Sequence, residues 1–242
     1  MLRQATQTAG GNASWSTASS TMNVNIYGVN VSFRLGNDGV REIAGMGLTV
    51  ADRVAVRADV FYPAVVNVAR EIVFVGAHEV VLGVPTGRYH TCVMIFVSPQ
   101  SPWHNNLRGF LPEHTRWGIR YAAIGGRSWE DNAFLQNFLE VVYSNQYDVN
   151  LDTKVVMRHL YTETQSNLNL VRDFYDVAAH YFDNSNRIVP YMMIPRSGRY
   201  EFNSNSFVSG FLQCFGYATG NINLGVEVTG WLRPVPRNYF GR

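Results

Sequence analysis

The side chains of this 242-residue chain that suit acyl-transfer chemistry fall in two separate groups. His90 stands near the start of a strongly apolar run, residues 89–97, which is typical of a buried β-strand. Far downstream, Ser204 lies in the polar string 203–206, just before an amphipathic run that ends at Gly216. A histidine that accepts the proton of a serine hydroxyl makes that serine a nucleophile, so this chemistry requires the two groups to meet.

The polar string lies where a helix is expected to begin, and this position has two explanations. Side chains there face the positive end of the helix dipole and backbone N–H groups that lack acceptors within the helix. This suits a nucleophile at Ser204 and an oxyanion site supported by Asn203 and Asn205. Asn and Ser are also common N-caps, so the residue types alone leave open whether the string is catalytic or only caps the helix.

The elements that would position these groups follow from periodicity and turn signals. Expected strands are residues 22–35, 53–61, 66–75, 78–84, 89–97 and 117–124, with a turn at 85–87 and the last strand closed by Gly125-Gly126. A first expected helix begins near Ser128, with Phe134, Phe138 and Val141 on one face. Further helices are expected at residues 165–182 and 204–216, before a short strand at 222–228. Strands first and helices later predict an α+β fold.

The start of the chain differs in composition from the rest. Residues 1–20 are rich in Thr, Ser, Ala, Gly, Gln and Asn and include one tryptophan, Trp15. Such a segment buries too little apolar area to offset the entropy of ordering it. We therefore expect a flexible arm over residues 1–20, in which only Trp15 can dock, and a single domain over residues 21–242. The arm also lacks the basic start and apolar stretch of a secretory signal.

Composition and charge limit the class of protein. Hydrophobic residues make up 46% and charged residues 16%, so the chain can bury a core. The net charge of +2, with scattered arginines, gives no indication of a nucleic-acid partner. No apolar run reaches the roughly 18 residues of a membrane-spanning helix. Lys154 is the only lysine among 20 basic residues, which fits both codon bias in a GC-rich genome and selection against lysine in a toxin that must avoid ubiquitin tagging.

Other catalytic signatures are incomplete. His78-Glu79 begins like a zincin helix, but Leu82 stands where the second histidine belongs. There is no Cys-x-x-Cys pair, no glycine-rich phosphate loop and no Gly-x-Ser-x-Gly elbow, so we expect neither a metal nor a cofactor. Cys92 and Cys214 lie in apolar runs and are expected to be core thiols.

A strand that begins with histidine, followed by another strand and then by a helix that opens on a nucleophile, resembles the circularly permuted papain-like hydrolases. These are the permuted branch of the NlpC-type peptidases, which includes the lecithin:retinol acyltransferase-like enzymes. His90 matches the strand histidine, and Asn203-Ser204-Asn205-Ser206-Phe207 matches a family motif that opens Asn-Cys-x-x-Phe, with Ser204 at the cysteine position. That string and the Gly230-Trp231…Pro234-x-Pro236 tail are also similar to bacterial papain-fold toxin domains. The resemblance spans residues 78–241 and rests on these two short motifs.

The resemblance implies an antiparallel sheet or partial barrel with helices packed on one side. It also implies a third catalytic residue on the strand after the histidine strand, here residues 117–124. That stretch offers Arg120 and Tyr121 but no carboxylate, histidine or asparagine, whereas Glu113 and His114 lie just ahead of it. The third member is therefore unassigned, with Glu113, His114 and Tyr121 as candidates.

A serine at the cysteine position changes the expected chemistry. A serine hydroxyl is far less acidic than a thiol, so Ser204 needs His90 as a true general base and a third group that orients the ring. The chain is then either a Ser-His hydrolase or an inactive member of the fold, including an engineered cysteine-to-serine trap.

The resemblance further implies a bacterial toxin or effector that is secreted by a non-classical route and cleaves an amide bond. Peptidoglycan peptide is the leading substrate, and a secretion-apparatus carrier and an immunity protein are the implied partners. One alternative is a lipid-directed esterase or acyltransferase of the same fold, which an exposed apolar rim near the site would favour over a peptide-binding polar groove. The other is a non-catalytic interaction or structural protein, which a long distance between His90 and Ser204 would favour.

Overall fold

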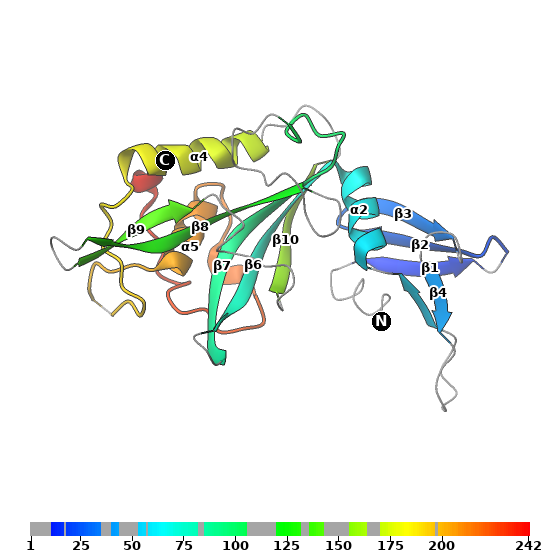
Figure 1. Cartoon of the computed structure of the whole chain (residues 1–242), viewed down its shortest axis with the longest axis horizontal. Coiled ribbons are helices and arrows are strands. Elements are labelled where there is room, and N and C mark those ends of the chain that lie inside the picture. Colours follow the sequence, from blue (N-terminus) through cyan, green and yellow to red (C-terminus); the bar gives the residue numbers. More distant parts are fainter. Residues whose placement is uncertain are drawn as a thin grey trace.

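The chain folds into antiparallel sheets and packed helices, so the expected α+β class is confirmed (Figure 1). The computed structural model describes residues 11–16, 18–34, 40–43, 53–56, 58–81, 85–105, 120–131, 136–142, 155–163, 170–196 and 198–242. The strands are β1 (Asn12–Ser16), β2 (Thr21–Ile26), β3 (Val29–Arg34), β4 (Val40–Ile43), β5 (Arg53–Val56), β6 (Glu71–Val81), β7 (Pro85–Val97), β8 (Arg120–Asp131), β9 (Gln136–Val142) and β10 (Val155–Glu163). The helices are α2 (Ala58–Ala69), α4 (Leu170–Asn184) and α5 (Ser204–Gln213), with 3₁₀ turns at Thr219–Asn221 and Arg237–Phe240.

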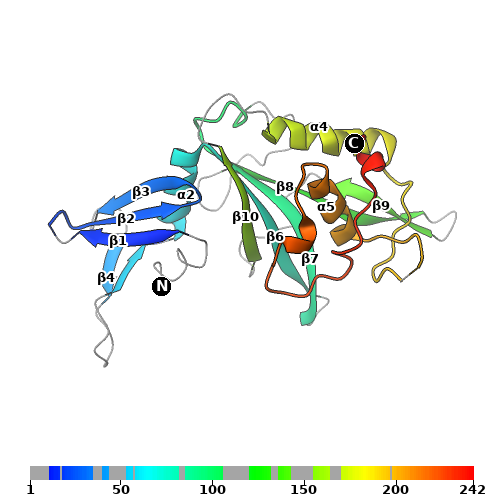
Figure 2. The ribbon, with the colours of Figure 1, turned by 180° about the vertical axis from the view of Figure 1, so that it is seen from behind.

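A five-stranded sheet, in the order β10-β6-β7-β8-β9, forms the centre of the molecule. Residues 72–77 of β6 and 92–97 of β7 carry no polar side chain, and successive side chains of a strand point to opposite faces. Val93 and Ile95 of β7 therefore join the cluster with α4 and α5, whereas Met94 and Phe96 join a second cluster with β2, β3 and α2. Helices thus flank both faces of this sheet, rather than the one side implied by the resemblance. The sheet β1-β2-β3 and helix α2 lie at the opposite end of the molecule from α4 and α5 (Figures 1 and 2).

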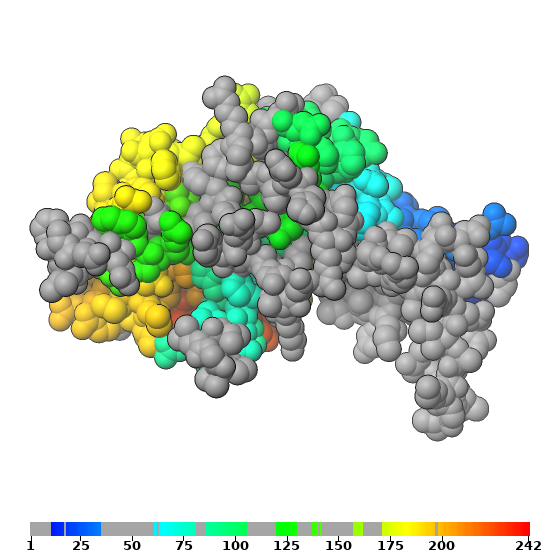
Figure 3. All heavy atoms as spheres, viewed as in Figure 1, coloured from blue at the N-terminus to red at the C-terminus, as the bar shows by residue number. Residues whose placement is uncertain are grey.

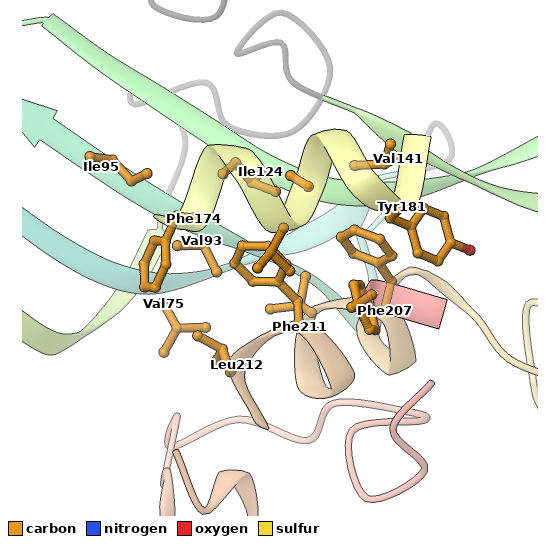
Figure 4. Packing of buried hydrophobic residues seen from close by; sticks show 14 of the residues in the cluster. Val75, Val93, Ile95, Ile124, Val141, Phe174, Tyr181, Phe207, Phe211 and Leu212 are labelled. Carbon is orange, nitrogen blue, oxygen red and sulfur yellow. The ribbon is translucent and has the colours of Figure 1, made fainter. Parts of the chain in front are cut away.

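Aromatic side chains fix α4 and α5 to the sheet. Phe174 of α4 and Phe207 and Phe211 of α5 are fully buried, and Tyr181 packs edge-on against Phe207 with 4.9 Å between ring centroids. Figure 4 shows these rings between the two helices and the aliphatic residues of the sheet. Each buried Phe contributes about 2 kcal/mol through the hydrophobic effect, so this cluster holds α5 rigidly in place.

Part of the segment that was expected to be a flexible arm forms a strand. Asn12–Ser16 form β1, which pairs with β2 in antiparallel register, with Trp15 opposite Met22. Trp15 packs against the second core cluster, as the composition suggested for this one residue. Residues 12–16 therefore belong to the folded part of the protein, and residues 1–10 and 17 lie outside the described part of the chain.

In two segments, a predicted helix is a strand or predicted strands are a helix. Residues 136–142 form β9 rather than a helix, because Leu139 and Val141 are buried at period two, a pattern that a short apolar window shares with a helical stripe. Phe134 lies outside the described residues. Conversely, the valine-rich stretch from Ala58 to Ala69 forms helix α2 rather than strands, with Phe61, Val65 and Ala69 buried on one helical face.

Two strand boundaries also differ from expectation, and one expected strand is absent from the described residues. β6 is one continuous strand that begins at Glu71, after Arg70 in the left-handed region with φ of 70°, rather than two strands. β8 continues through Gly125-Gly126 to Asp131. The expected strand at 222–228 is absent from the described C-terminal segment, where Gly225, with φ of 72°, interrupts extended backbone.

Candidate active site

The start of α5 is built by the side chain of Asn203. Its Oδ1 accepts from the backbone N–H of Ser206 at 2.9 Å, and its carbonyl accepts from the N–H of Phe207 at 3.1 Å. The predicted cap is therefore confirmed, and the helix begins at Ser204. The N–H groups of Ser204 and Asn205 have no acceptor within the helix, so the first turn presents two donors and the positive end of the dipole.

Asn203 is itself held by two loops. Its Nδ2 donates to the carbonyls of Met193 at 3.2 Å and Thr229 at 2.9 Å. Gly230 lies against the same amide with φ of 84°, and a Cβ at Gly230 would collide with the Asn203 side chain. Glycine at 230 thus permits the close approach that fixes the cap.

The first half of β7 is not paired with β8, because the two strands diverge. They pair only from Val93 to Val97, and from Gly125 onward β8 pairs with β9. Helix α5 fills the resulting space, and Gly126 permits its approach, since a Cβ there would lie 2.9 Å from the Cβ of Phe207. The start of β7 therefore has one backbone edge that β8 does not cover, and α5 begins beside it (Figure 2).

The side chain of Asn205 occupies that edge like a strand partner. Its Nδ2 donates to the Tyr89 carbonyl at 2.9 Å, and its Oδ1 accepts from the Thr91 N–H at 2.8 Å and the Thr91 hydroxyl at 2.9 Å. This is the pattern of a parallel strand facing His90, made by a side-chain amide instead of a peptide. Asn205 thereby fixes the backbone on both sides of His90, and its second Nδ2 hydrogen bond, to the Thr229 carbonyl, ties it to the C-terminal loop.

His90 and Ser204 meet at this point. The Nδ1 atom of His90 lies 2.9 Å from the Oγ atom of Ser204, so the predicted proximity of the two side chains is confirmed. When the serine hydroxyl donates, Nδ1 is the acceptor and the proton of the neutral ring lies on Nε2. His90 is half-buried, and Ser204 is 8% exposed, which shields both groups from most of the solvent.

A second histidine stands beside the first. His78 on β6 pairs directly with His90 in the antiparallel ladder, and their rings meet edge-on with 5.2 Å between centroids. In the sequence, His78 is marked only by the incomplete zinc motif His78-Glu79. A turn was expected at residues 85–87, but β7 already begins at Pro85, so the pairing of His78 with His90 could not be predicted from the turn signal.

Tyr191 is a further residue near the site that no sequence motif predicted. Its phenol lies near enough to Ser204 for the serine hydroxyl to lower the pKa of the phenol, but burial raises that pKa by more. The Tyr191 segment runs parallel to Phe202, with the Met192 N–H donating to the Phe202 carbonyl at 2.7 Å. Tyr191 follows Pro190 in a stretch without helical or strand periodicity, so no local signal marked it.

Of the three candidates for the third catalytic residue, the structure describes only Tyr121, and it does not lie at the site. Tyr121 lies in the second core cluster, against Phe96 at 5.6 Å between ring centroids and opposite Phe96 in the ladder. Phe96 is six positions along β7 from His90, or about 20 Å at 3.3 Å per residue. Tyr121 was a wrong candidate because β8 pairs it with the end of β7 that is farthest from His90. Glu113 and His114 lie outside the described residues.

Within the described ranges, no group of three or more His, Cys, Asp or Glu side chains is arranged to hold a metal ion. None of the helices there is long and apolar enough to cross a membrane. Comparisons with protein-family models, curated proteins and solved structures gave no match to this chain.

Proposed function

We propose that this chain is a hydrolase of permuted papain-like type, in which Ser204 is the nucleophile and His90 the general base. The 2.9 Å contact between His90 Nδ1 and Ser204 Oγ carries the proposal. Two further observations support it: the histidine comes from a strand, and the serine opens a buried helix that follows it in the chain. Asn203 caps the helix without any contribution from His90, so the contact between His90 and Ser204 is not needed for capping.

The reaction follows from these positions. Ser204 Oγ attacks the carbonyl carbon of an amide or ester while His90 Nδ1 takes its proton. The negative charge that develops on the carbonyl oxygen is stabilised by the N–H groups of Ser204 and Asn205 and by the Tyr191 hydroxyl. His90 then gives the proton to the leaving amine or alcohol as the bond to the acyl carbon breaks. Water, deprotonated by His90, cleaves the acyl-serine and regenerates the hydroxyl.

Two residues position the base in this proposal. His78 takes the third place of the site, where its edge contact restricts the orientation of the His90 ring. Asn205 holds the strand backbone on both sides of His90 at a fixed distance from Ser204. A serine nucleophile depends on this support more than a cysteine does, because the helix dipole alone does not ionise a hydroxyl.

The resemblance supports a delivered bacterial toxin or effector with an amide of peptidoglycan peptide as substrate. A lipid ester is the second candidate, and a specific observation favours it: Met193 and Ile194 are 58% and 48% exposed. Their segment is anchored to the site, because the Met193 carbonyl accepts from the Asn203 cap. An apolar rim of this kind suits an acyl chain better than a polar peptide.

Labelling with a fluorophosphonate, followed by peptide mass spectrometry, tests the proposed function. The proposal predicts a covalent adduct at Ser204 in the wild-type chain and at least a 100-fold slower reaction in His90→Ala. Hydrolysis of peptidoglycan fragments and of a phospholipid is then compared between wild type and Ser204→Ala. Labelling that is equal in wild type and His90→Ala would contradict the proposed roles.

A further inference from the structure

Exposed apolar side chains are concentrated beside the proposed active site. Large hydrophobic residues exposed in the described chain number eight, and five of them form what we call the apolar rim: Met192, Met193, Ile194, Tyr200 and Leu232. Leu232 is 76% exposed, the highest fraction of the eight. Figure 3 shows the segment after α4, coloured yellow to orange, at the surface beside the blue-green atoms of β7. Concentration of this kind marks an interaction surface, whereas exposed hydrophobics scattered singly are ordinary.

Hydrogen bonds bring the two parts of the rim together next to Ser204. Thr229 and Met193 both accept from the Asn203 side chain, which caps the helix that Ser204 opens. The Arg233 guanidinium donates to the carbonyls of Arg196 and Arg199. The loop that carries Leu232 is therefore tied to the loop that carries Met193, and both are tied to the start of α5.

The charge around the rim is positive. Residues 187–242 contain six arginines and two glutamates, a net charge of +4, whereas the whole chain carries +2 and the rest of it therefore −2. Arg196, Arg199 and Arg233 lie in the loops of the rim, where Glu201 is the one acidic residue. Glu201 is paired with Arg196, which lowers the pKa of its carboxyl to about 2, so the carboxylate offsets one arginine and leaves two.

We propose that the apolar rim docks this protein on an anionic phospholipid bilayer. Exposed Met, Ile and Leu side chains enter the boundary between headgroups and acyl chains, while the arginines beside them attract anionic headgroups. A protein partner of purely apolar surface would gain nothing from these arginines. Docking in this orientation brings the ester carbonyls of the lipids to the mouth of the site, and only this last step rests on the proposed function.

Vesicle sedimentation with the Ser204→Ala chain tests the docking without any hydrolysis. We expect binding to phosphatidylcholine–phosphatidylglycerol vesicles and much weaker binding to phosphatidylcholine alone, because surface attraction of arginines needs anionic lipid. The double change Met193→Asp and Ile194→Asp should lower the partition coefficient at least tenfold. Val68→Asp is the matched control, since Val68 is 49% exposed on helix α2, far from the rim, and its replacement should leave binding unchanged. Thermal melting of each variant confirms that it is folded.

Absence of binding to both vesicle types, or equal binding by the rim variant and the Val68 control, would overturn the docking proposal. Light scattering tests whether the apolar rim instead binds a second copy of this chain. An oligomer of the wild-type chain that persists with vesicles, and that is absent in the rim variant, would also overturn the docking proposal. Vesicle binding together with no labelling at Ser204 would reject the proposed function and leave the docking surface standing. Labelling at Ser204 without vesicle binding would do the reverse.

Discussion

The Asn205 side chain accepts the backbone N–H of Thr91 at 2.8 Å, so a helix residue takes the place of a strand partner at the uncovered edge of β7. The same amide donates to the carbonyl on the other side of His90. The residue that follows the proposed nucleophile thereby sets the position of the proposed base. Helix and strand are joined at the site by this amide, in addition to the serine–histidine contact itself.

Asn205→Asp tests this coupling. The substitution keeps an acceptor for Thr91 but replaces the donor to Tyr89 and Thr229 with an oxygen that their carbonyls repel. We expect a loss of about 2 kcal/mol in the free energy of unfolding, measured by urea denaturation, and a much larger relative loss of activity. Thr91→Ser is the matched control because it retains the hydroxyl that Asn205 accepts. Activity that falls only in proportion to the folded fraction would argue against a positioning role.

Tyr191→Phe tests the proposed oxyanion donor. The ring stays in place while the hydroxyl beside Ser204 is lost, so we expect kcat to fall about 100-fold with little change in KM. Burial raises the pKa of Tyr191, and its O–H therefore remains a donor up to at least its ordinary pKa of about 10. If the hydroxyl contributes only to structure, kcat is unchanged and the melting temperature alone falls.

Alkaline stability should be limited by the aromatic cluster. Burial strongly raises the pKa of Tyr181, so its neutral form is favoured in the folded protein. Because the pKa of Tyr181 is higher in the folded than in the unfolded protein, its neutral form contributes fully to the free energy of unfolding below the unfolded-state pKa of about 10. This contribution is lost as the pH rises above that value. We predict that the free energy of unfolding falls above pH ~10 in wild type and less steeply in Tyr181→Phe. Denaturation curves at several alkaline pH values provide the measurement, and parallel declines in the two proteins would exclude Tyr181 as the cause.

The start of the chain should contribute to stability. Removal of residues 1–16 deletes β1, its hydrogen bonds to β2 and the contact of Trp15 with the core. We expect the melting temperature to fall by several degrees, about the effect of 1–2 kcal/mol for a chain of this size. Removal of residues 1–10 alone keeps β1 and is the control. Equal melting temperatures for the two deletions would mean that β1 adds nothing.

Local patterns were enough to predict part of the site and not the rest. The Asn203 cap and the start of α5 follow from side chains within four residues of each other, and the apolar run after His90 marks β7 by itself. His78 lies at the site because β6 pairs it with His90, and Tyr191 lies there because its segment pairs with Phe202. Both pairings join residues that are separated in the sequence, so no local pattern predicts them. The same limit explains β9, because apolar residues at 138, 139, 141 and 142 fit both helical and strand periods until a neighbouring strand selects one.

The chemical environment of position 204 is the central claim, and Ser204→Cys measures it directly. A thiol at the start of α5 beside His90 should have a lowered pKa, because the helix dipole and a histidinium both stabilise the thiolate. The native thiols interfere little: Cys92 is buried, and burial raises the pKa of Cys214. The pH dependence of iodoacetamide alkylation, followed by mass spectrometry, gives the pKa of the new thiol. We predict a value at least one unit below the ordinary value of about 8.5, lost when His90→Ala is added. A thiol with ordinary reactivity, unchanged by His90→Ala, would contradict a catalytic Ser204–His90 pair.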